Sequence, residues 1–186
     1  MKFYDAMARL FDYPGLDYPE RIADVCAHTT GEMQARLQAF SGALERMGIS
    51  RMQEIYIETF EFRAETSPYI GHHLFGEEIR RNLFMVQLCG RYRECGFAET
   101  VEMPDHLSRV LRFLGATDVS EERTELIHIC LVPALQKLLR ALKSDNPYLP
   151  LLEAVLLACR QELTSVPQDR EIAWTSFYSS SSPTSR

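Results

Sequence analysis

The sequence predicts an all-α fold, a single-domain compact helical bundle of roughly eight helices. Apolar residues recur at helical spacing along most of the 186 residues. Short polar side chains, prolines and glycines stand where such segments would begin and end. Strand signals are almost absent, because no alternating β-branched run and no Asn-Gly or Asp-Gly hairpin turn occurs. These observations favour a bundle with short loops over a fold that contains a sheet.

Two helices are expected in the first fifty residues. The segment Asp17–Glu20 combines an N-cap, a proline near the first turn and a capping-box acid. Thr29 with Glu32 begins the next helix, whose apolar residues fall at steps of four and three along one stripe. Gly48 ends it, because glycine suits the left-handed position after a helix.

A third helix is expected to begin at Ser50, with Gln53 as its capping-box partner. The stretch Arg63–Gly76 has no helical period and contains a proline, two glycines and two adjacent histidines, so we predict a loop there. A long helix then runs from about Glu77 to Cys95 and ends at Gly96.

The second half has the same character without repeating the sequence. Pro104 and Asp105 begin a helix that ends near Gly115. Asp118 with Glu121 caps another, which should run to about residue 143.

Pro133 lies inside that last segment and should kink it. Asn146–Pro147 begins the final helix, in which leucines alternate steps of three and four. Beyond Thr164 the chain turns polar. We therefore expect a helical domain over residues 1–165 and a polar, disordered C-terminal tail over residues 166–186.

Charge and composition narrow the class of protein. A net charge of −6 with only three lysines disfavours a nucleic-acid partner, because phosphate binding needs clustered basic residues. No run approaches the roughly 18 apolar residues that span a bilayer. Asp5 and Arg9 interrupt what would be the apolar stretch of a signal peptide, so a cytoplasmic protein is expected. Five scattered cysteines without a CxxC pair are best interpreted as reduced core thiols.

Catalytic and metal-binding motifs are missing from the sequence. It has no GxSxG elbow, Walker loop, GxGxxG or HExxH pattern, so no catalytic residue is assigned. His72 and His73 are adjacent, but neighbours in sequence rarely both reach one metal, and no third ligand stands at a diagnostic spacing. Asp105 is interpreted as an N-cap, with His106 in the first turn of the helix.

Three segments together resemble the nitrate reductase delta-subunit, or NarJ-type, chaperones of the TorD/DmsD set of redox-enzyme maturation proteins. They are Tyr56–Phe60 (YIETF), Ser67–Gly76 (SPYIGHHLFG) and Glu102–Leu107 (EMPDHL). Each segment alone is a weak motif, whereas their order and separation make the resemblance fairly specific. It extends over roughly residues 1 to 163.

The resemblance implies an all-helical cytoplasmic chaperone. Such proteins bind the N-terminal segment of a molybdenum-containing catalytic subunit and hold it while the molybdenum cofactor is inserted. They delay membrane docking or export and are not retained in the finished enzyme. By the same resemblance, no cofactor is permanently bound to the chaperone itself.

The predicted loop and the following helix start form the candidate site. An apolar groove with a few polar anchors is what capture of an amphipathic peptide needs. Tyr56 and Phe60 have core spacing and are expected to support the loop rather than to touch the guest. The residues expected to bind the partner are Tyr69, His72, His73, Leu74, Phe75, Pro104, Asp105 and His106.

Two other functions are compatible with the same residues. A small helical enzyme or metal protein would use His72, His73, His106 and a thiol. A permanent structural subunit of an oxidoreductase would copurify with the finished enzyme. The chaperone is the leading hypothesis.

Overall fold

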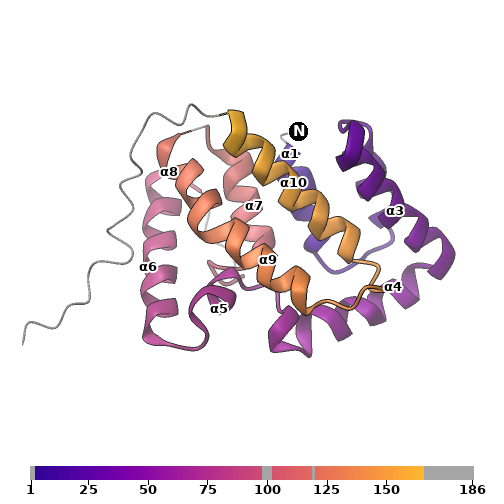
Figure 1. Ribbon diagram of the computed structural model, residues 1–186, viewed down its shortest axis with the longest axis horizontal. Helices are drawn as coiled ribbons and strands as arrows, with labels where there is room; N and C mark the ends of the chain where they lie inside the picture. The colour runs from indigo at the N-terminus through magenta and orange to yellow at the C-terminus, as the bar shows by residue number, and fades with distance from the viewer. Residues whose placement is uncertain (1–2, 98–101, 119, 166–186) are drawn as a thin grey trace, which may run out of the picture.

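The structure, a computed structural model, describes residues 3–97, 102–118 and 120–165. Within these ranges the chain is helical and forms no strand, which confirms the all-α bundle (Figure 1). Counted as continuous stretches of the described chain, eight helices have at least seven residues. No helix in these ranges is long and apolar enough to cross a membrane. The predicted tail from residue 166 lies outside the described residues.

The helices follow one another with short connections. In chain order they are α1 (Phe3–Ala8), α2 (Tyr18–Cys26), α3 (Gly31–Met47), α4 (Ile49–Tyr56), α5 (Ile70–Phe75), α6 (Ile79–Glu94), α7 (Leu107–Ala116), α8 (Glu121–Glu125), α9 (Val132–Ala141) and α10 (Leu149–Ser165). Two 3₁₀ turns, η1 (Arg9–Phe11) and η3 (Ala64–Thr66), and two π-helical segments, η2 (Ile57–Glu61) and η4 (Leu126–Leu131), join or extend them.

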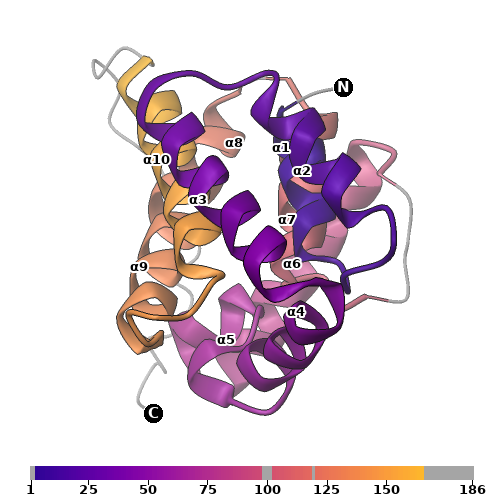
Figure 2. The same ribbon diagram turned by 90° about the vertical axis from the view of Figure 1, so that its right-hand side faces the viewer.

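Two close pairings bring the first and last described helices into the bundle. Helix α3 packs along α10, and Arg36 of α3 donates to Glu153 of α10 over 2.7 Å (Figure 2). Helix α1 packs along α7. At Gly115 of α7, a Cβ would lie 2.8 Å from the backbone nitrogen of Asp5, so only glycine permits this close approach.

A cluster of aromatic rings occupies the core between α3, α4 and α10. The centroids of Phe60 and Tyr148 are 5.0 Å apart, and those of Tyr56 and Phe60 are 5.2 Å apart. The Phe40 ring lies 5.4 Å from Tyr148. These edge-on and tilted contacts are the arrangements that aromatic pairs prefer. The structure therefore places Tyr56 and Phe60 in the core, beneath the segment that follows them.

Several predicted helix starts were wrong by one or two residues. Thr30, not Thr29, precedes α3, and its side chain makes no capping hydrogen bond. Helix α4 begins directly after Gly48, so Ser50 lies inside it and is not a cap. Ser120, not Asp118, caps α8 by accepting from the Arg123 N–H at 3.2 Å. Gly48 ends α3 with φ at 75°, as expected.

Two predicted irregularities can be compared with the structure. The segment Arg63–Gly76 is not a loop throughout, because it contains η3 and the six-residue helix α5. Its period was invisible because six residues make fewer than two helical turns. The expected kink at Pro133 stays a prediction; Pro133 lies at the second residue of α9, directly after the π-helical segment η4. A π-bulge is one of the ways in which a helix accommodates a residue that cannot donate.

Candidate functional site

The candidate site forms where the segment before α5 meets the segment before α7. The Ile70 N–H donates to the Asp105 carbonyl at 2.9 Å, and the Leu107 N–H donates to the Pro68 carbonyl at 2.7 Å. These bonds flank an isolated antiparallel bridge between Tyr69 and His106. The backbone thus joins residues that are 35 to 39 positions apart in sequence, which sequence spacing alone could not reveal.

Asp105 is the buried anchor of this junction and not the predicted N-cap. Its side chain is 0 % exposed, and Arg81 of α6 donates to it from Nε at 2.8 Å and from Nη2 at 3.4 Å. A Cβ at Gly71 would lie 2.7 Å from Asp105 Oδ2, so α5 can approach the carboxylate only because that residue is glycine. The Asp105 carboxylate accepts hydrogen bonds from the Arg81 side chain, whereas the carboxylate of an N-cap would accept them from backbone N–H groups at the start of the helix.

His106, predicted to lie in the first turn, is the N-cap of α7. Its Nδ1 accepts from the Ser108 N–H at 3.3 Å and lies 2.9 Å from the Ser108 hydroxyl. Accepting at Nδ1 requires the tautomer that carries its proton on Nε2. Burial lowers the pKa of His106, although Glu102, Asp12 and Asp105 act in the opposite direction. The imidazole is therefore held neutral in the position where it caps the helix.

Tyr69 lies partly exposed above this buried pair. Its ring is 5.4 Å from the His106 ring, edge to face, and the Arg81 guanidinium lies 5.3 Å from its centroid. Burial, together with the nearby Glu102 and Asp105 carboxylates, raises the pKa of its hydroxyl, so the ring stays neutral. The contacts with His106 and Arg81 therefore restrict the rotation of the Tyr69 ring.

The two adjacent histidines of α5 point to different partners. The Nε2 of His73 lies 2.7 Å from the Ser67 carbonyl, and its own carbonyl accepts from Lys137 of α9 at 2.7 Å. Burial lowers the pKa of His73. His72 Nδ1 instead lies 3.9 Å from the Glu77 carboxylate. No group of three potential metal ligands occurs in the described part of the chain.

The remaining predicted residues frame the junction. Leu74 and Phe75 are partly buried against the core, and the Phe75 ring lies 5.6 Å from Phe84 of α6. The Pro104 carbonyl accepts from the Tyr92 hydroxyl at 2.8 Å. Pro104 therefore contributes its backbone to holding α6, and Phe75 contributes apolar packing.

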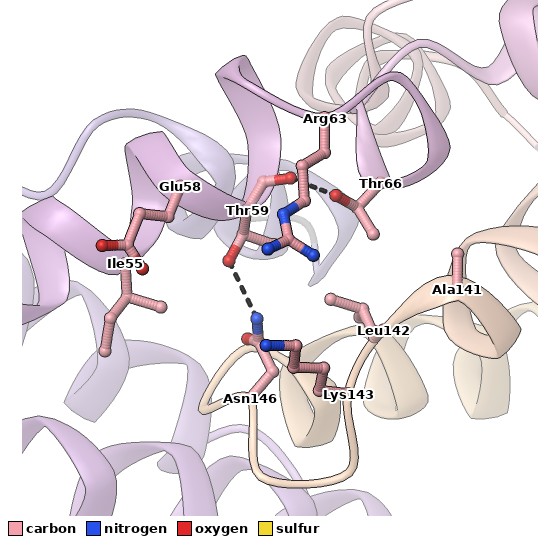
Figure 3. Close-up of a pocket in the computed structure, with 9 residues that line it drawn as sticks. All are labelled: Ile55, Glu58, Thr59, Arg63, Thr66, Ala141, Leu142, Lys143 and Asn146. Atoms are coloured by element: carbon pink, nitrogen blue, oxygen red, sulfur yellow. Dashed lines mark hydrogen bonds between the residues drawn. The ribbon is translucent and has the colours of Figure 1, made fainter.

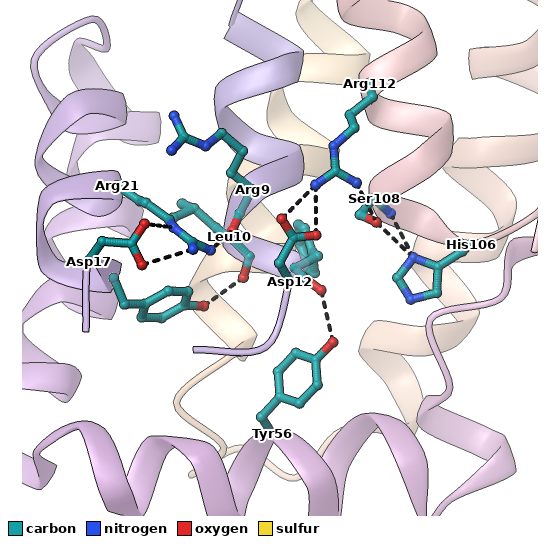
Figure 4. A network of polar contacts seen from close by, with 11 residues as sticks. Arg9, Leu10, Asp12, Asp17, Arg21, Tyr56, His106, Ser108 and Arg112 are labelled. Atoms are coloured by element: carbon teal, nitrogen blue, oxygen red, sulfur yellow. Dashed lines mark hydrogen bonds and ion pairs between the residues drawn. The ribbon is translucent and has the colours of Figure 1, made fainter. Parts of the chain in front are cut away.

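Sequence reasoning missed a polar network behind His106 (Figure 4). Arg112 of α7 donates to both carboxylate oxygens of Asp12, at 2.7 and 2.5 Å, and to the Ser108 hydroxyl at 3.1 Å. The Tyr56 hydroxyl donates to the Phe11 carbonyl at 2.9 Å in the same region. Asp12 and Arg112 are 100 residues apart, so no local pattern could have paired them.

Exposed apolar side chains on the neighbouring segments were also missed. Met103, directly before Pro104, is 43 % exposed, and Phe62, after η2, is 79 % exposed. Tyr13 is 49 % exposed, and its ring lies 5.6 Å from the ring of Tyr56. The sequence does not distinguish these three residues from apolar residues of the core. Only the fold shows that they remain at the surface.

A small cavity lies on the other side of η3, between η2 and the connection from α9 to α10 (Figure 3). Its volume is about 70 Å³, and Arg63, Lys143 and Asn146 are among its lining residues. The Asn146 side chain donates to the Thr59 hydroxyl at 2.8 Å across it. Sites for drug-sized ligands and cofactors are usually several hundred Å³, so this cavity is too small for an organic cofactor.

Fold and site together define a helical domain with a rigid, partly apolar surface site. The model of the nitrate reductase delta subunit family matches residues 26–152, more than half of the chain, and the protein belongs to that family. The "Probable nitrate reductase molybdenum cofactor assembly chaperone NarJ" of Bacillus subtilis (strain 168) is 27 % identical to it over 160 residues. That alignment covers 83 % of this chain and 86 % of the relative.

Proposed function

We propose that this protein is a system-specific chaperone for the assembly of a respiratory molybdoenzyme, a nitrate reductase or a related enzyme. It binds the N-terminal segment of the catalytic subunit in the cytoplasm and supports insertion of the molybdenum cofactor before membrane docking or export. It holds no cofactor permanently and catalyses no reaction. Membership of the delta subunit family and the likeness to an assembly chaperone support this role.

The observation that best supports the proposed binding site is that Tyr69 lies at the surface. Its ring is partly exposed, while Arg81 and His106 hold it from beneath. A rigid aromatic side chain loses little conformational entropy when it binds, which is why tyrosine is enriched at binding hot spots. Met103, three residues before His106 in the chain, adds exposed apolar area.

The charge of the site suits a guest that is both apolar and basic. The Glu77 and Glu78 carboxylates lie exposed after α5, and the whole chain has a net charge of −6. Exposed charges mainly accelerate encounter and are screened by salt, whereas buried apolar contacts determine the dissociation rate. We therefore expect the aromatic residues to dominate affinity and the acidic residues to influence the association rate.

The alternative of a metal-binding or structural subunit is not favoured by family membership. The two histidine rings of α5 are 5.8 Å apart, are inclined at 78°, and contact different groups. A metal analysis of the purified protein distinguishes a metal-binding protein from a chaperone. Copurification with a finished oxidoreductase would identify a structural subunit.

Calorimetric titration of the N-terminal peptide of the catalytic subunit tests the proposal. Tyr69→Ala should weaken binding by about tenfold or more, and Phe75→Ala should also weaken it. The double variant Glu77→Ala/Glu78→Ala should lose less affinity and should show a smaller dependence of the association rate on salt.

Met47→Ala is the matched control, because Met47 is 41 % exposed at the end of α3 and outside the site. Circular dichroism checks that each variant is folded. Absence of binding to the wild type, or equal binding by a folded Tyr69→Ala/Phe75→Ala variant, would refute the proposed site.

A further inference from the structure

Helix α6 has an apolar stripe on its outer side, which we define as Ile79, Leu83 and Val86. Their exposed fractions are 77 %, 56 % and 69 %. Steps of four and three residues place them on one face of the helix. The core-facing side of the same helix carries Phe84, Leu88 and Tyr92, all buried. Helix α6 is therefore apolar on two faces, and contiguous exposed apolar surface of this kind marks an interaction site.

The sequence after α10 contains an apolar segment that could cover the stripe. Residues 172–178 read IAWTSFY, between polar residues on both sides. Trp174, Phe177 and Tyr178 stand at positions i, i+3 and i+4, so in a helical turn they would share one face. The stripe on α6 is aliphatic and the segment is aromatic, so the two are complementary as apolar surfaces.

The end of α10 lies close to α6 through two successive ion pairs. Glu162, in the last turn of α10, accepts from Arg123 of α8 at 2.6 Å. Glu122 directly precedes Arg123 in α8. Its carboxylate lies 3.1 Å from the guanidinium of Arg91, near the C-terminal end of α6. Figure 1 shows α6 at the outer edge of the bundle, next to α8.

The connecting chain is long enough to reach the stripe. Six residues lie between Ser165 and Ile172, so seven Cα-to-Cα steps of an extended chain span roughly 23–25 Å. Along α6, Arg91 is about 7.5 Å from Val86 and about 18 Å from Ile79, at a rise of 1.5 Å per residue. The extended linker is therefore longer than the run of α6 from Arg91 to Ile79, which favours docking of the apolar segment alongside the stripe.

We propose that residues 172–178 dock on this stripe within the same chain, with Trp174 and Phe177 against Leu83 and Val86. The last turn of α6 carries Arg91 and Arg93 with Glu94, for a net charge of +1, and Asp169, Arg170 and Glu171, with a net charge of −1, precede the apolar segment. When the tail approaches α6 from the C-terminal end of that helix, the acidic residues lie near the last turn and the aromatic residues lie further along, at the stripe. A short tether makes docking intramolecular, with an effective concentration on the order of mM, so a modest apolar contact suffices. Docking is independent of the client site and shields the stripe from other apolar partners.

Trp174 is the only tryptophan in the chain, so its fluorescence reports on the docked segment without labelling. In the full-length protein its emission should lie at shorter wavelength than in a free peptide of residues 168–180. Acrylamide should quench it several-fold less efficiently. The double variant Leu83→Asp/Val86→Asp should shift emission and quenching to the values of the free peptide.

Leu16→Asp makes the same change at a side chain that is 91 % exposed and distant from α6 in sequence, and it should leave Trp174 unchanged. Circular dichroism should show unaltered helix content in both variants. Emission equal to that of the free peptide in the wild type, or protection unaffected by Leu83→Asp/Val86→Asp, would overturn the proposal. Protection of Trp174 from acrylamide that appears only at protein concentrations where sedimentation detects a dimer would also overturn the proposal. The stripe would then bind a second copy of the chain.

Discussion

Arg81 and Asp105 form an ion pair beneath Tyr69, with Arg81 Nε 2.8 Å from Asp105 Oδ2 and the carboxylate fully buried. The pair joins α6 to the segment before α7, and the guanidinium also lies 5.3 Å from the Tyr69 ring centroid. One arginine therefore neutralises a buried charge and supports the aromatic surface of the site. In the proposed binding site, stability and binding would therefore be coupled at this position.

Arg81→Ala should lower the free energy of unfolding by about 3–5 kcal/mol, because it leaves the Asp105 carboxylate buried without a partner. Denaturant unfolding measures the change. Arg51→Ala is the control, since the pair of Arg51 with Glu54 is 51 % and 62 % exposed and an exposed pair contributes little to stability. A loss at Arg81 no larger than that at Arg51 would show that the buried pair is not an anchor.

Gly71→Ala should destabilise the protein by about 1–3 kcal/mol, because the new methyl group would lie 2.7 Å from Asp105 Oδ2 and 3.1 Å from Phe84. Gly90→Ala, inside α6 with no atom within 4 Å of the new Cβ, should stabilise it by about 0.5–1 kcal/mol. Thermal unfolding of both variants measures the contrast. Equal shifts of the melting temperature in the same direction for the two variants would mean that α5 can move away from Asp105.

Ser120→Ala should lower the free energy of unfolding by about 0.5–2 kcal/mol, because it removes the hydroxyl that accepts from the Arg123 N–H. Thr30→Ala provides the comparison, since the Thr30 side chain makes no capping bond before α3. We expect a smaller loss there, measured by the denaturant midpoint at unchanged slope. A larger effect at Thr30 would contradict the assignment of the two caps.

The stability of the protein should fall as the pH drops below neutral, because burial lowers the pKa of both His106 and His73 from the ordinary value of 6.5. The unfolded chain then takes up these protons at higher pH than the native chain. The sign of the linkage follows: the stabilisation is complete above 6.5 and is lost as the pH falls toward the native pKa values.

Unfolding at about pH 7.5 and about pH 5.5 measures this loss. His106→Asn keeps a side chain suited to an N-cap and should reduce the difference between the two conditions. His28→Gln changes an exposed histidine in the turn after α2 and should retain the wild-type difference. An undiminished difference in His106→Asn would exclude His106 as a source of the pH dependence.

Much of the helical architecture followed from sequence pattern. The long stripe of α3, the leucines of α10 and the glycine that ends α3 are local signals, since periodicity and left-handed backbone depend on neighbouring residues. The exact caps were less predictable, because adjacent residues such as Thr29 and Thr30, or Asp118 and Ser120, offer similar polar oxygens. Backbone geometry chooses between them.

The segment and the helix start that make up the site were also recognisable in the sequence, through their residue types and order. What the sequence by itself determined is therefore an all-helical protein with a candidate binding segment between two helices. Only the tertiary structure decided that Asp105 is a buried ion-pair partner, that His106 is the cap, and that Tyr69 lies on top of both. The reason is physical: Arg81, Gly71 and Asp12 reach these residues across 24, 34 and 94 positions of sequence, and contacts over such separations are set by packing rather than by any local period.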